Sequence, residues 1–198
     1  MGYTGFERLW LFFAFSFFGW VLETVTAAVR QRRFVNRGLV NGPFCVLYGI
    51  TGTAMLVVCR ELHGIWLFLG SMIFSTLAEW IAGHVIERMY HERWWDYSHM
   101  KWNLDGYICV PVSIVWGVLG AATMRWGAPV LVRVFRMLPR TPGHLIVWIL
   151  AAVLAMDVTA TLCILSGRSR RIRQWEGVDS WLTGVSSRLE RKIYGWVD

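Results

Sequence analysis

The sequence has few charged residues and lacks the motifs of common soluble enzymes. Only 17% of its 198 residues are charged and 56% are hydrophobic, whereas soluble domains carry about 25% charged residues. The serine-hydrolase motif GxSxG, the zinc motif HExxH and the nucleotide-binding motif GxxxxGK[ST] are all absent from the sequence. These absences argue against a soluble enzyme, and any process driven by ATP would need an ATPase on a separate chain.

Cysteine pairs with the spacing of metal or redox sites are also missing. The cysteines are Cys45, Cys59, Cys109 and Cys163. All lie in apolar stretches and none forms a CxxC pair, so neither a disulfide framework nor a zinc site is expected. We interpret them as small apolar side chains.

Long apolar stretches dominate the sequence. They cover about residues 9–29, 44–59, 65–86, 107–126 and 144–165. A helix of about 20 apolar residues spans the hydrocarbon core of a membrane. The sequence therefore predicts an all-α, polytopic membrane helical bundle with about five transmembrane helices. Residues 128–138 are too few to cross and are expected to form a surface helix or a re-entrant segment.

The basic residues indicate an orientation in the membrane. The chain has 20 Lys and Arg against 13 Asp and Glu. Most basic residues fall on the cytoplasmic side if the N-terminus lies outside and the C-terminus inside, as the positive-inside rule requires. We expect the protein in the cytoplasmic membrane, with a transmembrane domain at 1–166. An excess of basic residues in a membrane protein reflects its topology and its contact with anionic lipids. No nucleic acid partner is expected.

Residues 167–198 are expected to form a cytoplasmic basic tail. Apolar residues recur there at steps of three and four from Trp175 to Ile193, which predicts one face of a helix. Such an amphipathic helix would bind the anionic inner leaflet through its basic residues. A coiled coil or a helix that binds a partner is the alternative.

Two parts of the sequence resemble each other at an offset of 64 residues. The identical pairs include Gly19 and Gly83, Glu23 and Glu87, Gly42 and Gly106, and Cys45 and Cys109. Each part has an expected helix, an acidic residue near its inner end, a polar loop and a returning helix. A duplicated helix-loop-helix unit is one interpretation, because repeats in transporters commonly enclose a site. The other interpretation is that the two parts are similar through shared hydropathy and chance.

Glu23, Glu79 and Glu87 lie within or beside the first and third apolar stretches, and Asp157 lies within the last. A charge at membrane depth costs about 2.5–3.5 kcal/mol on insertion scales and normally faces the interior of a bundle. One interpretation is a polar cavity, open to the cytoplasm, that binds a solute. Ion pairing that only fixes helix packing is the alternative. His84, Glu87 and His91 share a helix face, but one helix cannot complete a metal site, so no metal and no cofactor are expected.

The polar loops carry motifs of a known family. They read Gly19-Trp20-x-x-Glu23, Asn41-Gly42-Pro43-x-Cys45-x-x-Tyr48-Gly49, Arg93-Trp94-Trp95-Asp96-Tyr97-Ser98 and Asn103-Leu104-x-Gly106-x-Ile108-Cys109. Across about residues 9–126 the sequence resembles the ABC-transporter type IV family of CmpB-like permeases. That family often has proline after its first cysteine, where this chain has Val46. The resemblance implies a small bacterial membrane protein with a transport role, and it implies no substrate.

These observations place the candidate site at the inner face, between residues 36–43 and 93–106. The proposed substrate-binding residues are Glu23, Asn36, Arg37, Glu79, Glu87, Arg93, Asp96 and Asn103. Arg37 and Asp96 are expected to pair across the two loops. We expect a permease and not an enzyme, with membrane lipids and either a separate ATPase subunit or further copies of the chain as partners. A non-transporting scaffold and a membrane-embedded enzyme acting on lipid headgroups are the alternatives.

Overall fold

The computed structural model describes residues 2–32, 42–90 and 93–165. Residues 1–154 form one compact unit, and the chain from Ala155 to Asp198 forms a second. The helices that position the candidate site all belong to the first unit. The predicted tail, at 167–198, lies outside the described residues.

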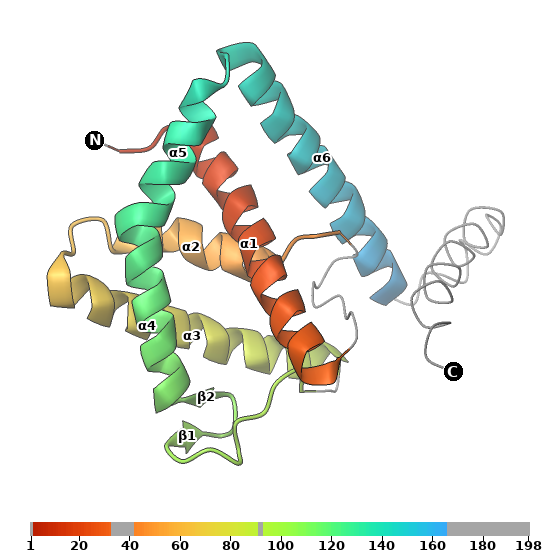
Figure 1. Ribbon diagram of the computed structural model, residues 1–198. Coiled ribbons are helices and arrows are strands. Elements are labelled where there is room, and N and C mark those ends of the chain that lie inside the picture. Colours follow the sequence, from red (N-terminus) through yellow and green to blue (C-terminus); the bar gives the residue numbers. More distant parts are fainter. Residues whose placement is uncertain (1, 33–41, 91–92, 166–198) are drawn as a thin grey trace, which may run out of the picture. The chain divides into compact units, whose positions relative to one another are not determined.

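The described chain is almost entirely helical (Figure 1). The helices are α1 (Gly5–Gln31), α2 (Val46–Val58), α3 (Gly64–Tyr90), α4 (Val110–Ala122), α5 (Ala128–Met137) and α6 (Arg140–Leu165). A π-helical turn, η1 (Thr123–Gly127), joins α4 to α5. Two short strands, β1 (Asn103–Leu104) and β2 (Ile108–Cys109), pair antiparallel. The predicted all-α fold class is confirmed.

Within the described residues, four segments are long and apolar enough to cross a membrane. They are Gly5–Val29, Gly64–Arg88, Val110–Met137 and Arg140–Thr161. Large apolar side chains on these segments are exposed, among them Phe18 at 55%, Ile73 at 56% and Val118 at 55%. Such a surface is suited to lipid rather than water. The chain is therefore a polytopic membrane bundle.

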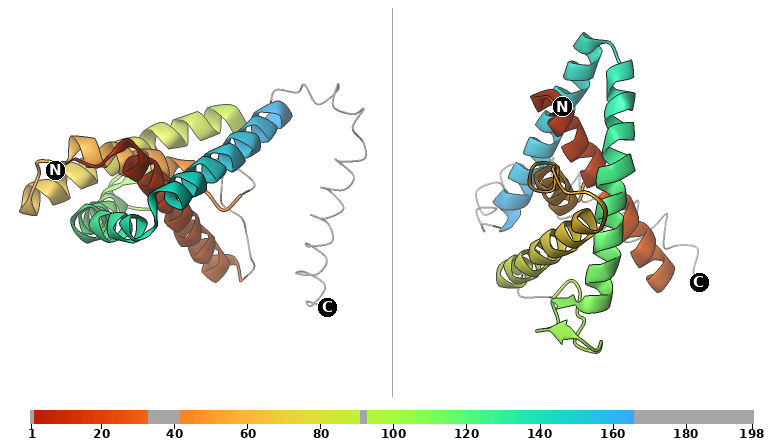
Figure 2. Two further views of the ribbon diagram at one scale, coloured as in Figure 1. Left: turned by 90° about the horizontal axis from the view of Figure 1, so that it is seen from above. Right: turned by 90° about the vertical axis from the view of Figure 1, so that its left-hand side faces the viewer.

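The prediction for residues 128–138 is wrong. This stretch is neither a separate surface helix nor a re-entrant segment, because α5 continues α4 through η1 within the single span Val110–Met137. Figures 1 and 2 show α4 and α5 as one continuous column. Pro129 lacks the N–H that an α-helix needs, and the π turn before it lets the helix continue without that bond. The stretch is too short to cross a membrane alone, but as a continuation of α4 it does not need to.

Helices α1 and α2 pack together as one hairpin, and α3 and α4 pack as another. Small residues permit the close approach in both. A side chain at Gly49 would collide with Ser16 of α1, and one at Gly120 would collide with Ser71 of α3. Contacts between glycine and serine are typical of helix packing in membranes. These glycines and serines do not align at the offset of 64, so the contacts leave the duplication an open prediction.

Helix α2 begins beside the middle of α1. It has 13 residues, fewer than the about 20 that a spanning helix needs. The non-helical residues Phe44 and Cys45 precede it and are buried, and the Cys45 N–H donates a 2.9 Å hydrogen bond to the Ser16 carbonyl. Irregular backbone at membrane depth is tolerated where protein covers it. The chain therefore runs back beside α1, first as the non-helical residues Phe44 and Cys45 and then as α2.

Candidate functional site

A network of polar side chains connects the two hairpins. The ring of Tyr48, on α2, fills the space left by Gly19 on α1. Its hydroxyl donates a 2.6 Å hydrogen bond to Glu23 Oε1. The same ring lies edge-on to the indole of Trp116, on α4, with 5.7 Å between the ring centroids. Tyr48 therefore links the carboxylate of the first hairpin to the second hairpin.

Glu79, on α3, is the other carboxylate of this network. Its Oε1 accepts a 3.1 Å hydrogen bond from the hydroxyl of Tyr97. Its Oε2 is buried and has no hydrogen-bond partner among the described residues, and the same holds for Trp116 Nε1 and Thr76 Oγ1. The indole lies near the Glu79 carboxyl group without the geometry of a hydrogen bond. We call Glu23, Tyr48, Glu79, Tyr97 and Trp116 the polar core.

The polar core is rich in acceptors and has no cation within the described part of the chain. Glu23 lies close enough to Glu79 for the two charges to interact. The ion pairs recorded among the described residues involve neither carboxylate. Tyr97 lies in the loop outside the spans, where burial and the neighbouring Glu79 raise the pKa of its phenol. Tyr97 is thus a hydrogen-bond donor at every physiological pH.

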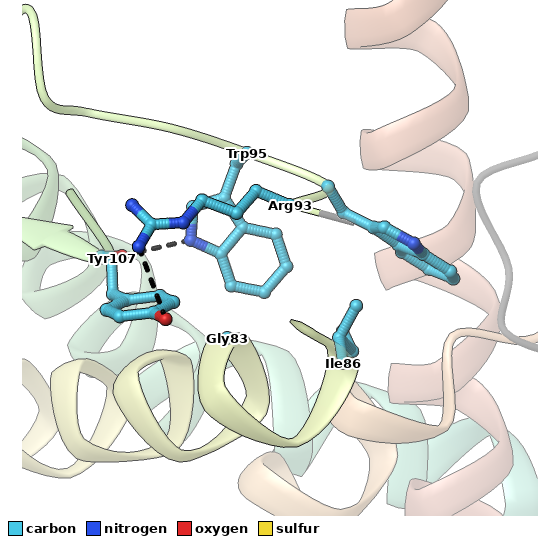
Figure 3. A pocket seen from close by; sticks show the side chains of 6 residues that line it. Gly83, Ile86, Arg93, Trp95 and Tyr107 are labelled. Atoms are coloured by element: carbon cyan, nitrogen blue, oxygen red, sulfur yellow. Dashed lines mark hydrogen bonds between the residues drawn. The ribbon is translucent and has the colours of Figure 1, made fainter. Parts of the chain in front are cut away.

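A second cluster lies where the loop after α3 folds back on the end of that helix (Figure 3). Arg93 Nε is 3.1 Å from Glu87 Oε1. Its Nη1 donates to the carbonyl of Asp105 at 3.0 Å, and its Nη2 to the hydroxyl of Tyr107 at 3.4 Å. The guanidinium carbon lies 4.5 Å from the centre of the Tyr107 ring. Tyr107 also donates its hydroxyl hydrogen to Glu87.

This second cluster, defined as Glu87, Arg93, Asp96 and Tyr107, is called the loop cluster. Its side chains are partly accessible, since those of Glu87 and Arg93 are each 35% exposed. Arg93 Nη1 is 4.0 Å from Asp96 Oδ1. The N–H and hydroxyl of Ser98 both donate to that oxygen, and these bonds lower the pKa of Asp96. The cluster therefore fixes the loop against α3 through charged hydrogen bonds.

A shallow depression with almost no enclosed volume, about 0 Å³, adjoins the loop cluster. It is lined by Gly83, Ile86, Arg93, Trp94, Trp95 and Tyr107. Figure 3 shows Arg93 above the Tyr107 ring and Trp95 beside it. The Trp95 indole donates a 2.9 Å hydrogen bond to the Tyr107 carbonyl. The depression is narrow, and the aromatic side chains around it are already engaged with one another.

The structure separates the predicted site residues into two places. Glu23 and Glu79 belong to the polar core, whereas Glu87, Arg93 and Asp96 belong to the loop cluster. Two further residues, Asn36 and Arg37, lie outside the described residues, and so does the predicted contact between Arg37 and Asp96.

Asn103 has a local role in the loop. Its Nδ2 donates to the Met100 carbonyl at 2.7 Å, and its Oδ1 accepts a hydrogen bond from the Gly106 N–H at 3.1 Å. Gly106 has φ of +75°, a conformation that suits glycine. Asn103 thus shapes the turn between β1 and β2.

The proposed site residues did not include the aromatic members of the two clusters, although Tyr48 and Tyr97 belong to the quoted motifs. Tyr48 and Tyr107 serve the same purpose, because each ring lies against a glycine four residues before the glutamate that accepts its hydroxyl. The sequence feature that could have pointed to these tyrosines is the repeated Gly-x-x-x-Glu at 19–23 and 83–87. The two tyrosines do not align at the offset of 64, so the comparison of the halves could not pair them.

A separate ion pair closes the N-terminal end of α1. Glu7 is buried and lies 2.7 Å from Arg136 at the end of α5. Glu7 also accepts the Thr4 N–H in a capping box that begins α1. Nearby, the Trp10 indole donates to the Leu131 carbonyl at 2.9 Å. These contacts attach α5 to the first helix.

His84, which was predicted to share a helix face with Glu87 and His91, packs against aromatic rings. The His84 ring lies 4.3 Å from that of Trp80 and 4.0 Å from that of Tyr107. His91 lies outside the described residues. Within the parts of the chain that the structure describes, no three His, Cys, Asp or Glu side chains form a group that could hold a metal ion.

A family model described as "Putative ABC-transporter type IV" matches residues 10–162. No curated protein and no solved structure matches the chain. The matched residues run from α1 into α6, and so include every member of the polar core and of the loop cluster.

Proposed function

The chain belongs to the family described as putative ABC-transporter type IV, and on that premise we propose that it is a permease that binds and translocates a small solute. It carries no GxxxxGK[ST] motif, so an ATP-driven cycle would depend on an ATPase subunit encoded separately. Further copies of the chain are the other proposed partner. The proposed activity is transport and not catalysis.

The polar core is the observation that carries this proposal. Ionisable side chains within membrane spans are costly and typically mark solute or ion pathways. Here Glu23 and Glu79 lie together at the junction of two hairpins, with hydroxyl and indole donors around them. Two carboxylates with no cation beside them in the described part of the chain favour a cationic or neutral hydrogen-bonding solute over an anion.

We assign the loop cluster to the inner closure of this pathway. Arg93 holds the loop on the end of α3 through Glu87 and Tyr107, and both charged side chains remain accessible to water. Breaking this contact would free the loop from α3. Asn36 and Arg37, from the equivalent loop of the first hairpin, are proposed to contribute from the same side.

The proposed orientation places the N-terminus outside and the C-terminus in the cytoplasm. It rests on the excess of basic residues in the segments that would then be cytoplasmic. The contact between Glu7 and Arg136 would close the opposite, outer end. In this arrangement the basic residues at 167–198 bind the anionic inner leaflet.

Transport into proteoliposomes tests the proposal. Vesicles containing the protein are screened for uptake of labelled amines, amino acids and sugars, with and without candidate ATPase subunits. We expect uptake of at least one solute class, and loss of that uptake in Glu23→Gln. Glu61→Gln is the matched control, because the Glu61 side chain is 82% exposed and lies in an exposed pair with Arg60, away from the polar core. Uptake that persists in Glu23→Gln would overturn the assignment of the polar core.

A further inference from the structure

The carboxylates of α1 and α3 differ in how their charge is balanced. Glu7 pairs with Arg136 and Glu87 pairs with Arg93, both with an Nε–Oε1 contact of 3.1 Å or less. Glu23 and Glu79 instead receive only neutral donors, from Tyr48 and Tyr97. The carboxylates at the helix ends are thus neutralised by arginine, and those of the polar core are not, as far as the described residues extend.

Glu79 is the less satisfied of the two core carboxylates. Glu23 accepts a short 2.6 Å hydrogen bond from the hydroxyl of Tyr48. Glu79 accepts a longer bond of 3.1 Å, and its second oxygen is buried with no partner among the described residues. An isolated charge in an apolar environment is so costly that the group usually becomes neutral instead. Two neighbouring carboxylates add a further penalty when both are ionised.

We propose that Glu79 is a proton-binding site and that the permease exchanges this proton with water as it changes conformation. The inference rests on the proposed function and adds a coupling ion to it. The step is a simple protonation, in which the carboxylate takes a proton from water at Oε2 and later returns it. No other bond forms or breaks.

Each protonation state of Glu79 has suitable neighbours. When protonated, Oε2 becomes a donor, and Thr76 lies one turn earlier on the same side of α3 with a buried hydroxyl that has no other described partner. When ionised, the carboxylate can take the unpartnered N–H of Trp116 in addition to the hydroxyl of Tyr97. The two unpartnered groups beside Glu79 thus match the two states.

The other titratable groups around Glu79 come from α1, α2 and the loop before α4, while α4, which also packs against α3, carries no titratable side chain. Glu23 lies on α1 and Tyr48 on α2, while Tyr97 belongs to the loop before α4. Tyr48 interacts in turn with Cys45, and Tyr97 with Cys109. All five are neutral or acidic, so none supplies a positive charge that would hold Glu79 ionised.

Infrared difference spectroscopy of the protein in liposomes, titrated with pH and with no solute present, tests the inference. We expect a carbonyl stretching band of a protonated carboxyl group at neutral pH, shifted in heavy water. The band should be absent in Glu79→Gln and retained in Glu61→Gln. In Tyr97→Phe, which removes a donor to the carboxylate, the band should persist to higher pH. Absence of the band from the wild-type protein, or its retention in Glu79→Gln, would overturn the inference.

The result is independent of the test of transport. A band that depends on Glu79 in a protein without any solute uptake would support the proton site and contradict the proposed function. Solute uptake by a protein without the band would support the proposed function and contradict the proton site. A melting curve for each variant, followed by circular dichroism, shows that a missing band does not reflect unfolding.

Discussion

The hydrogen bond between Tyr48 and Glu23 should stabilise the fold more than its counterpart in the second hairpin. Tyr48→Phe removes only the hydroxyl, so the ring still fills the space beside Gly19 and still lies against Trp116. A hydrogen bond to a charged group contributes about 1.5–3 kcal/mol. Because no arginine among the described residues pairs with Glu23, we expect Tyr48→Phe to lower the free energy of unfolding by about that amount.

Tyr107→Phe is the matched comparison. It removes the equivalent hydroxyl, but Glu87 keeps its ion pair with Arg93, so the loss should be clearly smaller. Both values come from reversible unfolding in mixed micelles, followed by circular dichroism. Equal losses in the two variants, or a loss of less than about 0.5 kcal/mol in Tyr48→Phe, would refute the reasoning.

Two further predictions concern the loop cluster. Arg93→Ala should release the loop from α3, because it removes the contacts of Arg93 with Glu87 and Asp105. Amide hydrogen exchange at residues 93–109 should then become faster, while exchange in α2 stays unchanged. Unchanged exchange in the loop would contradict the role of Arg93. Asp96 has a lowered pKa, so its bonds with Ser98 stabilise the loop above the ordinary pKa of an aspartate, and this contribution is lost as the pH falls through the lowered value. Asp96→Asn should therefore lower the melting temperature at neutral pH and make little difference in strong acid, and a difference that does not vary with pH would argue against it.

The helical architecture could be predicted because lipid imposes a simple rule on sequence. Apolar stretches of about 20 residues predict membrane helices, and the described part of the chain contains four such segments. The join between α4 and α5 could not be foreseen, since Gly127 and Pro129 resemble a break. A π turn that bridges them depends on backbone geometry and leaves no periodic signal in the sequence.

The candidate site could be predicted only in part. Carboxylates within apolar stretches are conspicuous, so Glu23 and Glu79 were identified from sequence. Their partners were not, because Tyr97 and Trp116 are 18 and 37 positions away from Glu79 in the sequence and read as interfacial or core aromatics. Which tyrosine meets which glutamate is decided by helix packing, and in particular by the glycines that admit each ring.

The rate of solute uptake by proteoliposomes carrying Glu79→Gln, relative to Glu61→Gln, tests the central claim most directly. If the polar core is the pathway, uptake falls to the level of empty vesicles in Glu79→Gln and stays at the wild-type rate in Glu61→Gln. Equal uptake by the two variants would show that the solute does not depend on the buried carboxylates.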